Sequence, residues 1–311
     1  MSDSNASLRL PPALAAIRAN KPLLFLLAGA LGGAAGSVLA EFAPGAGRGA
    51  SVGALIVTTG IWSAIATSVL CAALFAAGEW HQRRELRPRQ LSQILLFGAA
   101  AGFLSGAVAQ STYSIRFGTA EFHDTVVRIG CWGLMGAMLG ALLTKPIPNL
   151  GFWRGSLGGL LGGGLGGYGF ILLSKALGFT ARQLATAQAT TAAQAVACIA
   201  DVAARLLGLT VLGLALGLAM IVVEKLFREA SLEVIWAPGE TTKFNLGAQA
   251  VTIGGGEDHV FVRGLPPRFA SIVFANGVIE YVETASGART PLKNGSRLEI
   301  GKLNLVIHAA K

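Results

Sequence analysis

The chain has 311 residues, of which 53% are hydrophobic and only 13% are charged, and its mean hydropathy is +0.59. A soluble domain carries about twice that charged fraction, so the composition excludes an ordinary soluble protein and predicts one that lies in a lipid bilayer. The formal net charge of +9 would suggest nucleic-acid binding in a soluble protein. In a membrane protein an excess of Lys and Arg is instead typical of loops that face anionic lipid, so we expect no nucleic-acid partner.

Six apolar segments within residues 21–230 are long enough to cross a bilayer as helices. They are residues 23–40, 52–77, 91–110, 125–144, 155–174 and 206–223. Residues 1–20 before them are polar to mildly amphipathic. The tripeptide Val38-Leu39-Ala40 would also suit a signal-peptidase site, but we interpret the first segment as one copy of a repeat.

The fifth segment is unusual because eight of the twelve residues 158–169 are glycine. Each glycine costs about 1 kcal/mol relative to alanine in a water-exposed helix, whereas a bilayer forces the backbone to satisfy its own hydrogen bonds. The pattern G-x-G-x-x-G also occurs here, but no strand precedes it, so a dinucleotide loop is disfavoured. Small residues four apart predict a face on which two helix backbones approach closely, formed by Gly155, Gly159, Gly163 and Gly167.

The distribution of positive charge predicts the orientation. With six spans, both termini lie on one side of the membrane. That side carries roughly eleven Lys and Arg residues in the N-terminal segment and in the segments after the second, fourth and sixth spans, against about six on the other side. We therefore expect a bacterial-type inner-membrane protein with both termini in the cytoplasm.

Three segments align without gaps, namely residues 31–41, 100–110 and 165–175, and each ends in a polar residue. The helices that follow align through Trp62 with Trp132 and through Arg128 with Arg205. This predicts a two-helix unit repeated three times around a pseudo-threefold axis, where repeat-built bundles often hold transport sites. Shared Gly/Ala bias is the alternative explanation. Mitochondrial carriers also use three two-helix repeats, but their Pro-x-[Asp/Glu]-x-x-[Lys/Arg] signature is absent.

Polar residues at membrane depth are candidates for function, and the repeat supplies an equivalent set in Glu41, Gln110 and Lys175. Snorkelling of these side chains to the membrane surface is the competing interpretation. If they converge, Glu41 and Lys175 would form a charge pair on the axis. Asp201 and Arg205 are four residues apart on one helix, which is typical of a structural pair.

Catalytic, cofactor and metal sites are not predicted. Glu121, His123 and Asp124 lie in one loop, but a single His in an acidic loop is usually only solvated. The three cysteines lie far apart in apolar segments, which favours neither a disulfide framework nor a zinc site. No hydrolase or metalloprotease motif occurs, so we expect a protein that is not an enzyme.

From residue 231 to 311 the pattern changes to short alternating strands with turn signals, which predicts a β-sandwich or barrel. Asn276-Gly277 between two such runs is a strong hairpin signal. The predicted strands are residues 232–237, 242–246, 250–254, 259–263, 270–274, 278–282, 297–300 and 303–308.

Residues 242–309 resemble a forkhead-associated (FHA) domain. The resemblance is carried by Val251-Thr-Ile-Gly254, by Arg268-Phe-Ala-Ser-Ile272 and by residues 294–301, Asn-Gly-Ser-Arg-Leu-Glu-Ile-Gly. It implies a sandwich that binds phosphothreonine peptides at one end through an Arg, a Ser, a His and an Asn. In this chain the four corresponding positions are Gly255, Pro266, Phe269 and a position near Ala288. None of these residues supplies the usual phosphate contact, so we expect no recognition of phosphothreonine.

These patterns predict a membrane scaffold or signalling protein that presents the β-domain to a cytoplasmic partner, to its own membrane domain or to another copy of the chain. A diffuse positive surface for such contacts would come from Arg263, Arg268, Arg289 and Lys293. The alternative is a channel or transporter with the β-domain as its regulator.

Overall fold

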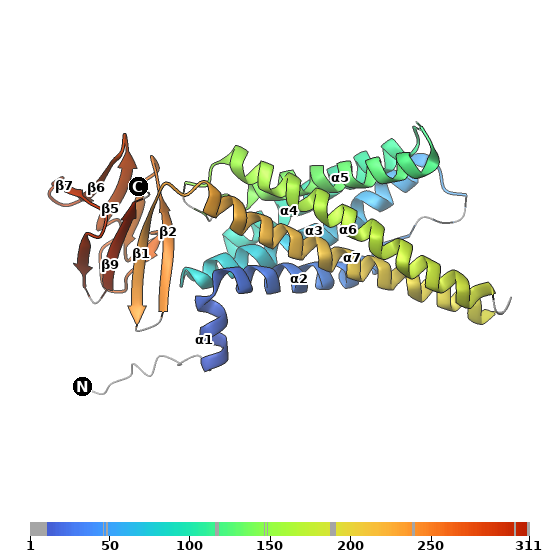
Figure 1. The fold of residues 1–311 in the computed structure, drawn as a ribbon, viewed down its shortest axis with the longest axis horizontal. Helices are drawn as coiled ribbons and strands as arrows, with labels where there is room; N and C mark the ends of the chain where they lie inside the picture. The colour runs from blue at the N-terminus through green and yellow to red at the C-terminus, as the bar shows by residue number, and fades with distance from the viewer. Residues whose placement is uncertain are drawn as a thin grey trace. The chain divides into compact units, whose positions relative to one another are not determined.

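The computed structural model describes residues 11–45, 47, 49–115, 118–145, 147, 149–186, 191–237, 240–301 and 303–309. These form seven helices followed by nine strands (Figure 1). The helices are α1 (Pro12–Ala19), α2 (Lys21–Ala40), α3 (Val52–His81), α4 (Pro88–Tyr113), α5 (Ala120–Leu142), α6 (Phe152–Thr186) and α7 (Thr191–Leu226).

The chain forms two compact units, each of which is described separately below. The helical unit consists of Phe25–Gly78 and Glu85–Arg228, and the β unit consists of Met1–Leu24, Glu79–Arg84 and Glu229–Lys311. The helix α1 and the last turn of α3 therefore belong to the β unit, in contrast to the predicted division into residues 1–20, 21–230 and 231–311.

Six helices, α2 to α7, are long and apolar enough to cross a membrane, which confirms the predicted helical membrane domain. The apolar parts of α6 and α7 cover Phe152–Leu173 and Val202–Leu226, but both helices continue beyond them. The extensions contain the Ala-, Gln- and Thr-rich residues 181–186 of α6 and 191–201 of α7. The side chains of Asp201 and Cys198 in this stretch lie outside the described residues.

Glycines set the arrangement of the helical unit. Two glycine faces of α6 contact different neighbours: Gly163 meets the backbone of α5 at Trp132, and Gly162 meets α7 at Ala219. In the same way α2 lies between α7, through Gly29, and α3, through Gly36. α4 contacts α3 through its own glycines and also contacts α5. The outer helices α2, α4 and α6 thus each bridge two of the inner helices α3, α5 and α7, the arrangement expected of three repeated helix pairs.

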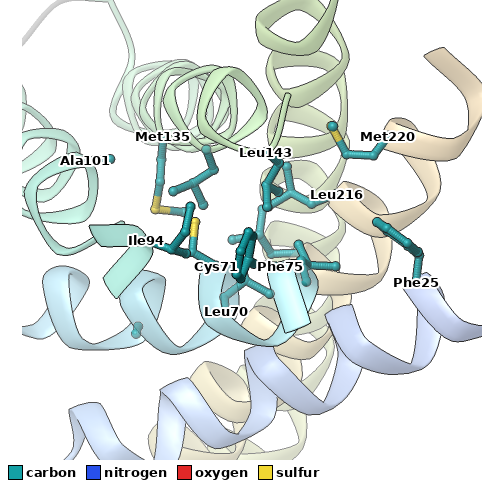
Figure 2. Packing of buried hydrophobic residues seen from close by; sticks show 14 of the residues in the cluster. Phe25, Leu70, Cys71, Phe75, Ile94, Ala101, Met135, Leu143, Leu216 and Met220 are labelled. Atoms are coloured by element: carbon teal, nitrogen blue, oxygen red, sulfur yellow. The ribbon is translucent and has the colours of Figure 1, made fainter. Parts of the chain in front are cut away.

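The interior of the helical unit is a single apolar core. Among the described residues it contains side chains from α2, α3, α4, α5 and α7, and Figure 2 shows ten of them by name. Leu139, Leu212 and Leu216 on the inner helices have no exposed surface. The core therefore closes the centre of the bundle over much of its length.

The β unit contains two sheets. One has the strand order β2-β1-β9-β8 and the other β4-β3-β5-β6-β7, and both contribute to one apolar core. The strands are β1 (Ala230–Ala237), β2 (Glu240–Leu246), β3 (Val251–Gly254), β4 (Val260–Phe261), β5 (Ala270–Ala275), β6 (Val278–Glu283), β7 (Arg289–Leu292), β8 (Arg297–Ile300) and β9 (Leu303–Ala309).

The predicted hairpin at Asn276-Gly277 is confirmed, since it joins β5 to β6 and both residues have positive φ angles of 53° and 79°. Strand β7 was not predicted, because its Pro291 lacks the N–H that an inner strand needs. In the structure β7 is an edge strand, where a proline is tolerated. The predicted strand at residues 259–263 shortens to two residues.

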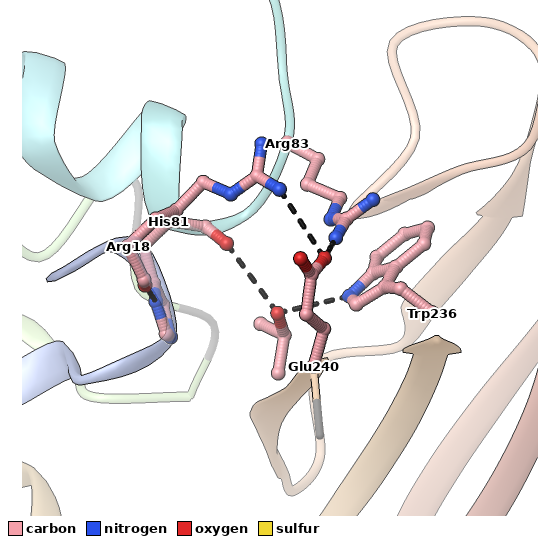
Figure 3. Close-up of polar contacts among 6 residues, drawn as sticks. Arg18, His81, Arg83, Trp236 and Glu240 are labelled. Carbon is pink, nitrogen blue, oxygen red and sulfur yellow. Dashed lines mark hydrogen bonds and ion pairs between the residues drawn. The ribbon is translucent and has the colours of Figure 1, made fainter. Parts of the chain in front are cut away.

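A polar cluster within the β unit joins segments that are far apart in the sequence (Figure 3). The carboxylate of Glu240 pairs with Arg83 and lies 3.3 Å from Nη2 of Arg18. Thr242 Oγ1 donates to the carbonyl of His81 at 3.3 Å. Burial and the positive charge of Arg18 lower the pKa of Arg83 to about 10. The cluster ties α1 and the end of α3 to the β1–β2 hairpin.

The helix contact at Gly163 predicts a sharp difference between two adjacent glycines. A Cβ at Gly163 would overlap the carbonyl oxygen of Trp132, whereas a Cβ at Gly164 would meet only Cγ2 of Ile129 at 3.8 Å. Gly163→Ala should destabilise the folded protein by about 1–3 kcal/mol, the usual cost of overpacking. Gly164→Ala should leave it unchanged or stabilise it by up to about 1 kcal/mol through helix propensity.

Thermal unfolding of the purified variants in one detergent measures this difference. Equal melting temperatures of the two variants would show that the α5–α6 contact is not as close as the structure places it.

Candidate functional site

The helical unit contains an axial pocket of about 600 Å³. It lies toward the end of the bundle where α2 ends, α3 begins, α4 ends and α5 begins, which is called the loop end below. Its lining comes from the end of α2, from α3, α5 and α7, and from Phe170 of α6. A volume of this size lies within the range of small-molecule sites, about 300–1,000 Å³.

Two sets of repeat-equivalent residues line this pocket. The alignment that pairs Trp62 with Trp132 and Arg128 with Arg205 extends to a third member in each set. The outer set is Thr58, Arg128 and Arg205, and the set one helical turn deeper is Trp62, Trp132 and Leu209. All six residues line the axial pocket. The three inner helices therefore present corresponding positions to one shared space.

A smaller side pocket of about 210 Å³ adjoins the axial pocket. The two share Thr59, Trp62, Arg128, Trp132 and Leu209 in their linings. The side pocket lies between α3, α4 and α5. The hydroxyls of Thr67 and Ser105 in its lining donate to backbone carbonyls, at 2.7–2.8 Å and 3.0 Å. These groups are thus already satisfied, and the side pocket is mainly an apolar space.

Three residues that line the axial pocket carry buried polar atoms without a hydrogen bond. Nε of Arg205 lies 3.2 Å from Oε1 of Glu41, but without the geometry of a hydrogen bond. Nε1 of Trp62 is also buried. In the described part of the chain, five buried side-chain atoms have no hydrogen-bond partner, and these three are among them. Arg205 and Glu41 thus partner each other as an ion pair, whereas Nε1 of Trp62 is a buried donor for which the described residues supply no acceptor, an exception among buried polar groups.

Arg128 is held from one side. Its Nε donates to both carboxylate oxygens of Asp124 at 3.0 Å, and Asp124 also accepts from Tyr113 at 2.9 Å. The guanidinium of Arg128 lies 5.5 Å from the centre of the Phe170 ring. The ion pair with Asp124 uses only the Nε edge of the guanidinium, so its two terminal amino groups remain to serve the pocket.

The predicted polar triplet is only partly brought together. Glu41 lines the axial pocket and pairs with Arg205, while Gln110 lines the side pocket and accepts from Thr59 at 3.3 Å. Lys175 is exposed and pairs with Glu121 at 2.6 Å. A direct Glu41–Lys175 pair does not form, because each residue has a nearer partner of opposite charge.

Glu121, His123 and Asp124, predicted in a loop, lie at the start of helix α5 and contact other residues of the chain. Besides these contacts of Glu121 and Asp124, His123 Nε2 donates to the carbonyl of Ile115 at 2.8 Å. Among the described residues no three His, Cys, Asp or Glu side chains gather as a metal ion would require.

The four predicted packing glycines line one face of α6, against α5. Gly155 contacts Gly140, and Gly159 contacts Gly136. A Cβ added at Gly167 would lie 3.0 Å from the Cβ of Trp132. This face positions Trp132, and with it one wall of the axial pocket.

The predicted basic surface of the β unit divides into two parts. Arg263 follows β4, Arg268 precedes β5 and Arg289 begins β7, so the strand directions bring all three to one end of the five-stranded sheet. Lys293 follows β7 and therefore lies at the opposite end, because each strand residue advances the chain by about 3.3 Å.

Two of the positions that would contact phosphate in an FHA domain have surroundings that do not suit the residues of that family. A Cβ at Gly255 would overlap the carbonyl oxygen of Leu265, which leaves no room for an arginine without movement of the loop. Phe269 packs against the apolar core. The FHA resemblance itself stays a prediction.

Comparison of the chain with protein-family models, with curated proteins and with solved structures gave no match.

Site residues that the sequence left unassigned are Thr58, Thr59 and Trp62. Trp62 and Trp132 were noticed only as markers of the repeat. The signal was present in the alignment, because residues at equivalent positions of inner helices must share one axis.

The pocket and the closed core beneath it predict that water reaches positions in the pocket but not positions in the core. In a chain whose Cys71, Cys131 and Cys198 are replaced by alanine, Thr58→Cys should react with a charged, membrane-impermeant thiol reagent. Leu216→Cys should not react, because Leu216 has no exposed surface. Labelling of the protein in sealed vesicles, with reagent on either side, also reports which side the loop end faces. Reaction at Leu216→Cys would show a water path through the core.

Proposed function

We propose that the helical unit binds a small solute in the axial pocket and that the chain is a transporter or sensor of that solute. The observation that carries this proposal is the lining of the axial pocket, which combines the charged side chains of Arg128, Arg205 and Glu41 with Trp62, whose buried Nε1 has no hydrogen-bond partner among the described residues. Unsatisfied buried groups cost roughly 1–3 kcal/mol each. Such a cost persists at a site where a ligand or bound water supplies the missing partners.

The fully buried leucines favour a binding site over an open channel. Conduction needs a continuous path, whereas Leu139, Leu212 and Leu216 close the bundle beyond the pocket. Transport would then require these inner helices to move, as in alternating access around a central site. Sensing would require only that occupancy of the pocket changes the packing of the same helices.

The orientation in the membrane follows from two features. Positive charge is concentrated in the N-terminal segment and in the segments after the second, fourth and sixth spans, which favours the cytoplasm for that side. In addition, α1, Glu79–Arg84 and the β strands belong to one compact unit, and a compact unit lies on one side of a membrane. On this basis the axial pocket opens away from the cytoplasm of a bacterial-type inner membrane.

Filling the pocket tests the proposal. Solutes of several chemical classes are screened for a concentration-dependent rise in the melting temperature of the purified protein. A bound ligand at about 100 times its Kd stabilises the folded state by about 2.7 kcal/mol. The rise should disappear in Thr59→Trp, whose larger side chain occupies the shared part of the two pockets.

Uptake of the same solute into liposomes containing the protein then separates transport from sensing. Stabilisation that is equal in the wild type and in Thr59→Trp would place the binding site elsewhere and refute the proposal.

A second candidate function is a membrane scaffold or signalling protein that presents the β unit to cytoplasmic partners. It is favoured by the exposed Arg263, Arg268 and Arg289 at one end of the five-stranded sheet. Exposed arginines attract acidic peptides or a negatively charged surface, and the attraction weakens as salt screens it. Partners of this kind include another protein, the protein's own helical unit or a second copy of the chain.

This second function predicts binding that depends on charge but not on phosphothreonine. The full-length protein in nanodiscs should bind a phosphorylated threonine peptide no more tightly than the matched peptide with glutamate in that position, because Gly255 leaves no side chain to grip the phosphate. Fluorescence anisotropy at two salt concentrations measures both peptides. Phosphate-selective binding that survives moderate salt would contradict the expectation.

A further inference from the structure

We infer that the solute of the axial pocket is a small organic acid, with an oxyanion beside Arg128 and Arg205 and an apolar body in the side pocket. The inference rests on the proposed solute-binding function and adds the chemical class of the solute. The lining of the two pockets includes the N–H groups of Arg128, Arg205 and Trp62, and these donors lie beside an apolar recess.

The donors come from three residues on three inner helices. Arg128 spends only its Nε on Asp124, and an arginine carries five N–H donors in total. Arg205 makes no hydrogen bond with the described residues, and Nε1 of Trp62 has no acceptor. A carboxylate or phosphate is acceptor-only and could be held by all three, since charge-assisted pairs of this kind are the strongest hydrogen bonds in proteins.

The charges around the two pockets are balanced in pairs. Among the described residues that line the two pockets, Arg128 and Arg205 are positive and Glu41 is the one carboxylate. Asp124 balances Arg128 from outside the lining. Glu41 therefore acts as an internal competitor, since its carboxylate lies where the oxyanion of a ligand would approach Arg205.

The apolar part of the ligand is indicated by the walls of the side pocket. These include Trp62, Trp132, Val127 and Met135, and the ring of Trp132 lies 5.0 Å from that of Phe170. The side pocket and the axial pocket share Arg128 and Trp132 in their linings. A ligand that places an oxyanion at the arginines can therefore extend its flat or aliphatic body between α3, α4 and α5.

The experiment uses the full-length protein in phosphatidylcholine nanodiscs and measures binding of benzoate by isothermal titration calorimetry. Benzyl alcohol keeps the body without the charge, benzylamine reverses the charge, and acetate keeps the charge without the body. We expect benzoate to bind most tightly, with each of the other three probes at least about tenfold weaker. Benzyl alcohol and benzylamine lose an interaction with a charged group, and acetate loses the burial of the apolar ring.

Three variants give opposite expectations. Trp62→Phe keeps the ring but removes the N–H donor, and should weaken benzoate binding about tenfold. Glu41→Gln removes the competing carboxylate, and should tighten benzoate binding. Lys175→Gln is the matched control, because Lys175 is a cation near the loop end but lies outside both linings, and it should leave the affinity unchanged.

The outcomes separate this inference from the proposed function. If benzylamine binds most tightly, and binds more weakly in Glu41→Gln, the ligand is not an organic acid and the inference is overturned. The proposed solute-binding function would still stand. Loss of benzoate binding when the nanodiscs contain phosphatidylglycerol would identify a lipid headgroup as the natural anion and overturn a soluble acid. Absence of binding by every probe overturns the inference, and if Thr58→Cys is also unreactive, the solute-binding function falls with it.

Discussion

The structure of the helical unit depends on contact between helix backbones at glycine. Helices in lipid gain little from burying apolar surface, so their association relies on close packing, and small residues permit the closest approach. Here the glycines of α2 and α6 allow each of these helices to lie against two inner helices at once. This double contact holds α3, α5 and α7 around a common axis and thereby defines the space in which the pocket forms.

The inner helices fill that axis unevenly. In the deeper part, Leu139, Leu212 and Leu216 have no exposed surface and belong to the apolar core. About two to three turns toward the loop end from Leu139 and Leu216, equivalent positions hold arginine, threonine and tryptophan instead. Long side chains with charged ends do not pack into a closed core, because burying them without partners is costly. A pocket at the loop end and a sealed core below it follow from the same three-helix geometry.

The β unit is assembled from three separate stretches of chain. Glu240 on β2 pairs with Arg18 before the first span and with Arg83 after the second, and all three side chains are less than one-third exposed. Partly buried pairs that share one carboxylate contribute more than isolated surface pairs. The unit therefore includes the polar ends of chain segments that flank the first two spans, and a change in these segments would act directly on the β1–β2 hairpin.

Much of this architecture was determined by the sequence alone, because it follows from local patterns. Length and hydropathy were sufficient to predict the six spans. Alternation of apolar and polar residues, together with Asn276-Gly277, predicted most of the β strands. The spacing of glycines predicted the packing face of α6. The edge strand β7 was not predicted from the sequence. Pro291 is acceptable only where one side of a strand has no neighbour, and strand order is a tertiary property. The site likewise depended on tertiary structure. The alignment paired Arg128 with Arg205, but only packing showed that these residues share a pocket with Trp62 and Glu41, whereas Lys175 turns to Glu121. Sequence periodicity determines which residues lie on one face of a helix, but the rotation and depth of each helix against its neighbours decide which faces meet.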